Sequence, residues 1–148
     1  VPDTDEWLVP LGKGNIVKEG NDVTIVAFSI MVGKALEAAE ELSKKGIDAE
    51  VIDLRTLRPL DIDLIVQSVK KTNRLISCEE GFPFSGIGAE LGMQVNENAF
   101  DYLDAPIMRV TGKDVPMPYA ANLEALTLPQ SHDVVKAALK ACYVEEDI

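Results

Sequence analysis

The stretch VTIVAFSIMVGKALEAAEELSKKGIDAEVIDL, residues 23–54, decides the fold expected of this chain. It begins with a β-rich run at residues 23–28 and ends with another at residues 49–54. Between them, residues 32–45 carry apolar side chains at helical spacing, which predicts an amphipathic helix with one face on a sheet. That face consists of Val32, Ala35, Leu36, Ala39 and Leu42. Gly46 is positioned to end the helix.

The same alternation continues along the chain. Further β-rich runs lie at residues 74–78 and 107–110, and helical patterns lie at residues 61–71, 86–99 and 131–142. Strands that alternate with helices in this way predict an α/β fold with a parallel sheet, here with four strands.

Two further helices carry start signals. The helix at residues 61–71 is introduced by Pro59 and is expected to be capped by Asp61. The last helix begins after Pro129 and is expected to be capped by Ser131. Residues 1–22 carry no such pattern and are interpreted as a connecting arm, followed by one domain at residues 23–148.

Composition limits the possible functions. The chain has 148 residues, 47% of them hydrophobic, which suits one domain that buries about two thirds of its unfolded surface. A net charge of −11 makes nucleic acid an unexpected partner, because phosphate binding relies on clustered Lys and Arg. The acidity suits either a basic protein partner or simply solubility. No apolar run approaches the roughly 20 residues of a membrane span, and no targeting segment is visible.

Single reactive side chains give little indication of catalysis. Cys78 and Cys142 are far apart and have no companions at metal-ligand spacing, so both are interpreted as small core residues. His132 is the only histidine and lies at the start of the last helix, where a solvated or capping role is expected. The run Gly86-Ile87-Gly88 opens a helix, but it lacks the spacing and position of a dinucleotide fingerprint.

In an open parallel sheet, ligands usually bind beyond the carboxyl ends of the strands. This edge is expected to carry six candidate residues, either structural or at a subunit interface: Arg55, Arg58, Glu79, Glu80, Pro116 and Pro118. A catalytic carboxylate pair at Glu79 and Glu80 is one interpretation, although adjacent strand residues point to opposite faces. The alternative, an ion pair from one of them to Arg55 or Arg58, is the interpretation we favour.

Four irregular segments carry a family resemblance. They are RTLRPLD at residues 55–61, EEGFPF at residues 79–84, YLDAP at residues 102–106 and TGKDVPMPYAANLE at residues 111–124. Together they closely resemble the carboxy-terminal domain of the pyruvate dehydrogenase β subunit, and the resemblance covers nearly the whole chain. It implies a three-layer α/β/α sandwich, the transketolase carboxy-terminal fold, with a mostly parallel five-stranded sheet and one antiparallel strand. The fifth strand is expected near residues 15–17 or beside the 111–128 loop.

The resemblance also implies a function. Similar enzymes decarboxylate pyruvate on thiamine diphosphate, with Mg²⁺, and pass the acetyl group toward acetyl-CoA within a multienzyme complex. In them the cofactor is bound by other domains, so this domain is expected to be non-catalytic and to organise an α2β2 heterotetramer from an α subunit and a second β subunit. The compartment implied is a bacterial cytoplasm or a mitochondrial matrix.

Partner-binding residues follow from the same resemblance. In similar complexes this domain receives the small basic subunit-binding domain of the dihydrolipoyl acetyltransferase, and Asp104 and the terminal Ile148 match positions expected at that contact. Glu145, Glu146 and Asp147 add negative charge beside the terminal carboxylate. The same tail also suits a frayed, solvated end.

Three functional hypotheses remain open from the sequence. The first is an assembly domain of the pyruvate dehydrogenase β subunit, or the equivalent domain of another 2-oxoacid dehydrogenase or transketolase-family enzyme. The second is a regulatory domain that binds a small anion at the carboxyl edge. The third is a free-standing α/β enzyme, and the lack of a convincing nucleophile, metal cluster or phosphate loop weighs against it.

Overall fold

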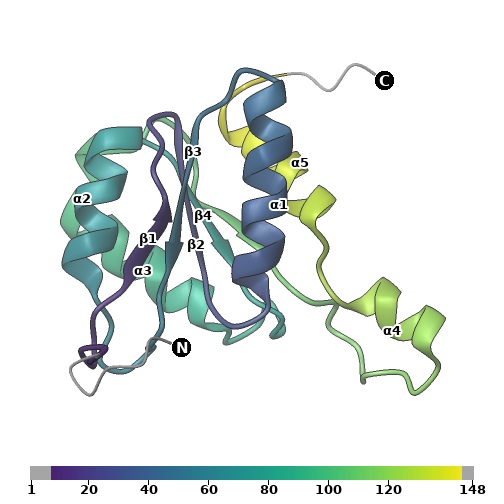
Figure 1. The fold of residues 1–148 in the computed structure, drawn as a ribbon. Coiled ribbons are helices and arrows are strands. Elements are labelled where there is room, and N and C mark those ends of the chain that lie inside the picture. Colours follow the sequence, from purple (N-terminus) through teal and green to yellow (C-terminus); the bar gives the residue numbers. More distant parts are fainter. Residues whose placement is uncertain (1–7, 145–148) are drawn as a thin grey trace.

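The computed structural model describes residues 8–144, which form a five-stranded sheet between two layers of helices (Figure 1). The predicted three-layer sandwich is confirmed, with strand order β1-β3-β2-β4-β5. The strands are β1 (Asn15–Lys18), β2 (Val23–Ala27), β3 (Ala49–Asp53), β4 (Leu75–Cys78) and β5 (Met108–Val110). The helices are α1 (Met31–Lys44), α2 (Ile62–Thr72), α3 (Ile87–Ala99), α4 (Ala121–Thr127) and α5 (Ser131–Ala141), with a 3-10 turn at Phe100–Tyr102.

The sheet is parallel except at one edge. Strands β3, β2, β4 and β5 run parallel to their neighbours, whereas β1 pairs antiparallel with β3, with Asn15 opposite Asp53. The fifth strand therefore lies at the first of the two positions expected, inside the stretch interpreted as a connecting arm. Both sheet faces are covered, which explains why the central strand β2 is apolar or buried at every position.

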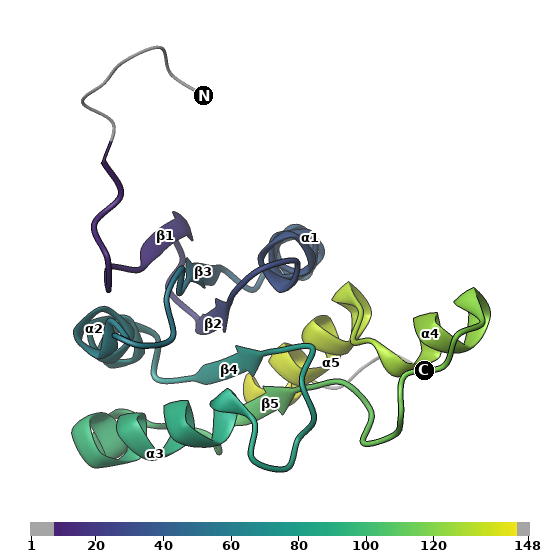
Figure 2. The same cartoon turned by 90° about the horizontal axis from the view of Figure 1, so that it is seen from below.

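Each face of the sheet has its own core. Helices α1 and α5 cover one face, and α2 and α3 cover the other (Figure 2). The apolar stripe predicted for α1 turns inward, with Ala35, Ala39 and Leu42 fully buried. Gly46 follows the helix with φ +80°, a left-handed conformation that favours glycine at this position. The helix ends as the sequence predicts.

Of the two predicted helix caps, Asp61 is confirmed as the N-cap residue of α2, although its side chain does not cap the helix, and Ser131 is wrong. Asp61 precedes α2, but its side chain accepts hydrogen bonds from the Gly14 N–H at 3.1 Å and Lys13 Nζ at 3.3 Å instead of from its own helix. It therefore ties the segment before β1 to α2. Ser131 is the first residue of α5, and the cap is Gln130, which forms a capping box with Asp133.

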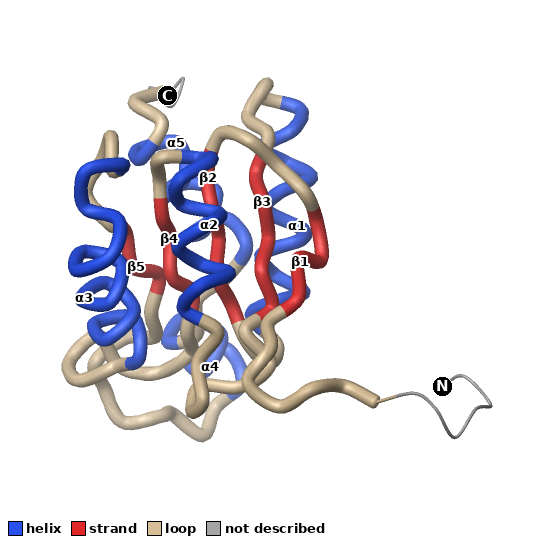
Figure 3. Tube along the Cα trace, turned by 90° about the vertical axis from the view of Figure 1, so that its left-hand side faces the viewer, coloured by secondary structure: helices blue, strands red, loops and turns tan. Residues whose placement is uncertain are grey.

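Helix α4 was not predicted. It lies outside the sandwich, on a segment that leaves the sheet after β5 and returns to begin α5 (Figures 1 and 2). Figure 3 shows the loops after β2, β3 and β4 gathered at the same end of the molecule as this segment. That end is the carboxyl edge of the parallel strands.

Candidate docking surface

The carboxyl edge of the sheet is built from loops with fixed backbone geometry. Ser29 and Arg55 each lie two residues past a parallel strand, and both have left-handed φ values, of 56° and 55°. Ser85, in the loop after β4, has φ 56°. Non-glycine residues adopt this conformation only where the surrounding structure holds them there. The edge therefore presents a defined surface.

Glu79 follows β4 directly and is 3% exposed. Its Oε2 accepts a hydrogen bond from the Ile87 N–H at 3.0 Å, and its Oε1 accepts one from the Gly88 N–H at 2.9 Å. Arg109 of β5 donates from Nη2 to the same Oε1 at 3.3 Å. A carboxylate at a helix start satisfies N–H groups that have no partner within the helix. Glu79 thus joins α3 to β4 and β5.

The favoured ion pair to Arg55 or Arg58 is wrong. Both arginines are exposed on the loop between β3 and α2, and neither forms an ion pair within residues 8–144. The reason is the strand order, because β2 separates β3 from β4 whereas β5 lies directly beside β4. Glu80 is partly exposed, so the two carboxylates occupy different environments rather than forming a pair.

The glycines that open α3 make room for this carboxylate. A Cβ at Gly86 would lie 2.6 Å from Glu79 Oε1, and a Cβ at Gly88 would lie 2.6 Å from Ser77 Oγ. The first N–H groups of α3 are already bound by a side chain of the protein. This helix start therefore offers no free anion site, which removes the basis for a phosphate site at this position.

A projecting segment, residues 113–126, extends from the carboxyl edge away from the sandwich. Its ends are held together by the Lys113 N–H, which donates to the Thr127 carbonyl at 2.9 Å. The preceding Gly112 N–H donates to the Gly81 carbonyl at 2.9 Å and anchors the stem to the loop after β4. The segment contains the predicted edge residues Pro116 and Pro118 and most of α4. Both prolines therefore lie on the segment that follows the carboxyl end of β5.

No residue of the projecting segment is buried. Nevertheless it carries five large apolar side chains, and Tyr119 is as exposed as in an unfolded chain, at 106%. The other four are Val115, Met117, Leu123 and Leu126, exposed by between 44% and 71%. Clusters of exposed apolar side chains mark interaction sites in proteins.

The neighbouring loops enlarge this apolar surface. Phe84 and Phe82, in the loop after β4, are 83% and 50% exposed. Ile30 and Leu57 project from the loops after β2 and β3. These four side chains and the projecting segment together form what we call the docking surface. Its composition suits protein contact, and its irregular, apolar sequence is the part that helix and strand periodicity did not explain.

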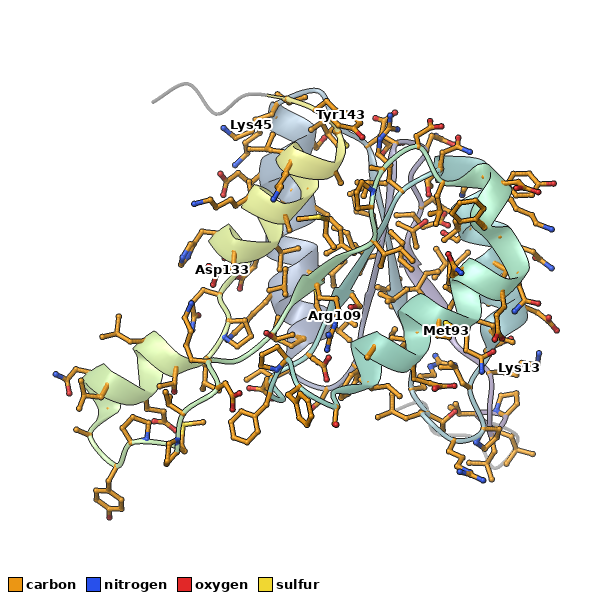
Figure 4. All side chains as sticks on the ribbon, turned by 180° about the vertical axis from the view of Figure 1, so that it is seen from behind. Lys13, Lys45, Met93, Arg109, Asp133 and Tyr143 are labelled. Atoms are coloured by element: carbon orange, nitrogen blue, oxygen red, sulfur yellow. The ribbon has the colours of Figure 1, made fainter. Side chains whose placement is uncertain are left out.

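Asp104 lies at the amino end of the parallel strands, opposite the carboxyl edge that carries the docking surface. It precedes β5, and its carbonyl accepts a hydrogen bond from the Tyr143 hydroxyl at 3.1 Å, near the end of α5 (Figure 4). Its carboxylate lies 3.8 Å from Arg74 Nη2 and is 60% exposed. The sequence-predicted tail residues Glu145, Glu146, Asp147 and Ile148 lie outside the described residues.

Reactive side chains in the described part of the chain have structural environments. Cys78 is fully buried and Cys142 is partly buried, and burial raises the pKa of both thiols. His132 is exposed and lies 3.4 Å from Asp133 Oδ1. Within residues 8–144, no group of three His, Cys, Asp or Glu is arranged to hold a metal ion, and no helix is long and apolar enough to cross a membrane.

One buried charge lies within the sheet. Glu50 of β3 is fully buried, and its carboxylate accepts hydrogen bonds from Ser68 Oγ at 2.5 Å and from Lys71 Nζ. Thr24 and Thr72 extend the network through hydroxyl contacts of 2.6 Å. Burial raises the pKa of Glu50, but the hydrogen bonds from Lys71 and Ser68 outweigh it and hold that pKa below its usual value. The hydrogen bond between Lys71 and Glu50 also raises the pKa of Lys71.

Comparison with known proteins gives this arrangement a family context. A family model described as "Transketolase, C-terminal domain" matches residues 12–134. The chain is 62% identical, over 93% of its length, to "Pyruvate dehydrogenase E1 component subunit beta-1, mitochondrial" of Oryza sativa subsp. japonica, and covers 37% of that protein. It is 52% identical, over 97% of its length, to "Pyruvate dehydrogenase E1 component subunit beta" of Rhizobium meliloti (strain 1021), and covers 31% of it.

A solved structure agrees with the sequence comparison. "Split gene transketolase, inactive beta4 tetramer" superimposes with a TM-score of 0.81 at 34% identity, over 99% of this chain and 47% of that one. The chain therefore spans less than half the length of each of these three proteins.

Proposed function

The chain belongs to the transketolase C-terminal domain family, and from this premise we propose that it is the carboxy-terminal domain of the β subunit of a pyruvate dehydrogenase E1 component. The observation that carries the proposal is 62% identity to the rice β subunit across nearly the whole of this chain. The whole enzyme would carry out the thiamine-diphosphate-dependent oxidative decarboxylation of pyruvate that leads to acetyl-CoA. This domain would contribute to assembly.

Assembly through the docking surface is the step that the geometry supports best. Fourteen consecutive residues fold back on themselves and bury no side chain, although five of them are large and apolar. Such a segment contributes little to the stability of its own domain, because apolar side chains stabilise a fold by leaving water. We infer that it packs against the rest of the β subunit or against the α subunit in an α2β2 heterotetramer.

The opposite edge of the sheet would receive a different partner. Asp104 is exposed beside Tyr143, and residues Glu145, Glu146, Asp147 and Ile148 follow shortly after Tyr143 in the sequence. Concentrated negative charge favours a basic partner and speeds its association. This supports docking of the basic subunit-binding domain of the dihydrolipoyl acetyltransferase at this edge.

The start of helix α3 does not fit the pyrophosphate of thiamine diphosphate. Pyrophosphate binds naturally at a helix start next to a parallel strand, but at α3 that position is taken by the Glu79 carboxylate, which would repel another anion. We therefore assign the cofactor and the metal to other domains of the enzyme and derive no chemical step in this one. A bacterial cytoplasm or a mitochondrial matrix is the proposed compartment, in keeping with the relatives from a bacterium and a plant mitochondrion.

Reconstitution tests the proposal. The natural gene product that contains this domain would be purified, its intact mass measured, and its pyruvate- and thiamine-diphosphate-dependent activity assayed with and without a pyruvate dehydrogenase α subunit. We expect a product roughly two to three times the length of this chain that is active only in the mixture. Activity of this chain alone, or no activity in the mixture, would overturn it.

A further inference from the structure

Strand β5 leaves one side of the sheet unpaired. It is the last strand in the sheet and pairs only with β4 among the described residues. The Val110 carbonyl faces β4, where it accepts the Glu79 N–H at 3.0 Å. Because backbone groups alternate in direction along a strand, the N–H and C=O of the preceding Arg109 face away from the sheet. A free strand edge of this kind is a template for another strand.

A cavity lies on each side of this edge. One, of about 510 Å³, is bounded by β5, α5 and the return from the projecting segment. The other, of about 680 Å³, is bounded by α3 and by residues 103–107 before β5. Arg109 lines both cavities, and Figure 4 places it between α5, marked by Asp133, and α3, marked by Met93.

The cavity beside α5 is cationic. His132, Lys136 and Lys140 recur every four residues along α5, which places them on one face, and Lys113 lines the wall opposite. None of these three lysines forms an ion pair within residues 8–144, and Asp133 is the only acidic residue of the lining. Like charges at this spacing destabilise a helix slightly. The row stands out in a chain of net charge −11.

The cavity beside α3 is apolar. Its lining includes Ala89, Met93, Phe100, Leu103 and Ile107. Met93 and Phe100 are 57% and 65% exposed, so their side chains border open space. The only charged residues in this lining are Asp104 and the shared Arg109.

We propose that the free edge of β5 binds an extended peptide segment in which acidic and apolar side chains alternate. Successive side chains of a strand point to opposite faces. A segment paired with β5 would therefore direct its acidic side chains toward the lysines of α5 and its apolar side chains into the cavity beside α3. The backbone of the bound segment would form hydrogen bonds with the outward-facing N–H and C=O groups of Arg109. This proposal does not rest on the proposed function.

The charge and the pattern of the ligand follow from the two cavities together. A basic segment would be repelled by Lys113, Lys136 and Lys140, and a uniformly acidic one would place carboxylates in the cavity beside α3. Because β5 has three residues, few main-chain bonds can form, and the side chains must supply most of the selectivity. The partner is therefore chemically distinct from the basic domain expected near Asp104.

A designed probe tests this inference. A capped hexapeptide of alternating glutamate and valine would be titrated into the chain at low salt, with fluorescence anisotropy for affinity and amide hydrogen exchange for location. We expect saturable binding that weakens with salt, and protection of the Arg109 amide, while the amides of Met108 and Val110, which face β4, change little. Two control peptides are an alternating lysine–valine peptide and a peptide with its glutamates and valines in separate blocks. Both should bind at least about tenfold more weakly than the alternating glutamate–valine peptide, because each exposed charge contact contributes modestly to the free energy of binding.

Charge reversal locates the site on α5. Lys136→Glu with Lys140→Glu should weaken binding of the probe by about tenfold or more, whereas the matched reversal of Lys44 and Lys45, which lie at the carboxyl end of α1 and line neither cavity, should not. No binding of the alternating peptide, equal binding of the lysine peptide, or equal loss in both double variants would overturn the proposal. So would protection of Arg109 that depends on protein concentration without peptide, because the occupant would then be a second copy of this chain.

Discussion

The sandwich and the projecting segment follow opposite rules of burial. In the sandwich, large apolar core side chains such as Ile25, Leu42 and Ile76 have essentially no exposure. In residues 113–126, Met117 and Tyr119 are more than half exposed although the backbone forms a closed loop and a helix. The sequence of the sandwich is explained by packing within this chain. We propose that the sequence of the segment is explained by packing against another part of the enzyme, and the following predictions test that difference.

The largest effect on stability should come from the sandwich. Leu42→Ala removes a fully buried side chain between α1 and the sheet, and we expect it to lower the free energy of unfolding by about 3 kcal/mol. Urea denaturation monitored by circular dichroism measures this loss. The matched change in the projecting segment, Leu126→Ala at 71% exposure, should cost less than about 0.5 kcal/mol. Equal losses would mean that the segment is part of the domain's own core.

The next effect concerns the buried charge. Glu50→Gln should lower the free energy of unfolding at neutral pH by about 2 kcal/mol, because hydrogen bonds to Ser68 and Lys71 are weakened in a buried site. The lowered pKa of Glu50 means that its contribution is present above the usual value of 4.5 and is lost as the pH falls through the folded value. Lys71, with a raised pKa, loses its contribution only as the pH rises above 10.5.

Denaturation across the acid range checks this sign. The wild-type chain should lose stability below about pH 4.5 more steeply than the Gln variant, since only the wild type must protonate Glu50. Parallel pH profiles for the two proteins would show that the network around Glu50 does not depend on its charge.

A smaller effect is expected where the sandwich meets the docking surface. Glu79→Gln replaces a carboxylate that accepts two backbone N–H groups and faces Arg109, and it should cost about 1.5 kcal/mol. The adjacent Glu80→Gln, at a partly exposed position, should change stability by less than about 0.5 kcal/mol. Thermal unfolding of both variants distinguishes a buried structural carboxylate from an exposed one. Equal shifts would contradict the assignment of Glu79.

The smallest effect should come from the most exposed aromatic side chain. Tyr119→Ala should leave the free energy of unfolding of this chain unchanged within about 0.5 kcal/mol. The reason is that Tyr119 loses no contact with water on folding, so its removal costs no burial. The urea midpoint and slope measure this. A loss near that of Leu42→Ala would show that Tyr119 packs within its own chain.

Sequence patterns predicted the sandwich well because the pattern of each helix and strand lies within a short stretch of the chain. The apolar stripe on α1 is predicted from the helical period alone, and Gly46 is predicted from the left-handed conformation that ends a helix. By contrast, the partner of Glu79 depends on which strand lies beside β4, and the sequence does not determine that β5 takes this place. Arg109 was missed for this reason, although an arginine in the middle of a short β-rich run was a signal that it has a buried acidic partner.

The projecting segment was harder to predict for another reason. Periodicity and capping signals report how a chain packs on itself, and α4 has no buried face within the described structure. Pro116 and Pro118 just before it also suppress a helical pattern. Family resemblance identified the segment as characteristic of the family, whereas the exposure of its apolar side chains is visible only in the three-dimensional structure.

Assembly of the whole subunit tests the central claim most directly. The proposed β subunit would be prepared with Met117, Tyr119 and Leu126 all replaced by serine, and its association with a pyruvate dehydrogenase α subunit would be measured by sedimentation velocity. If the segment packs within the heterotetramer, the variant should fold with normal stability in the isolated domain but lose most of its heterotetramer. A variant β subunit that is as stable as the wild type and also assembles as tightly with the α subunit would contradict the claim that these side chains pack against another part of the enzyme.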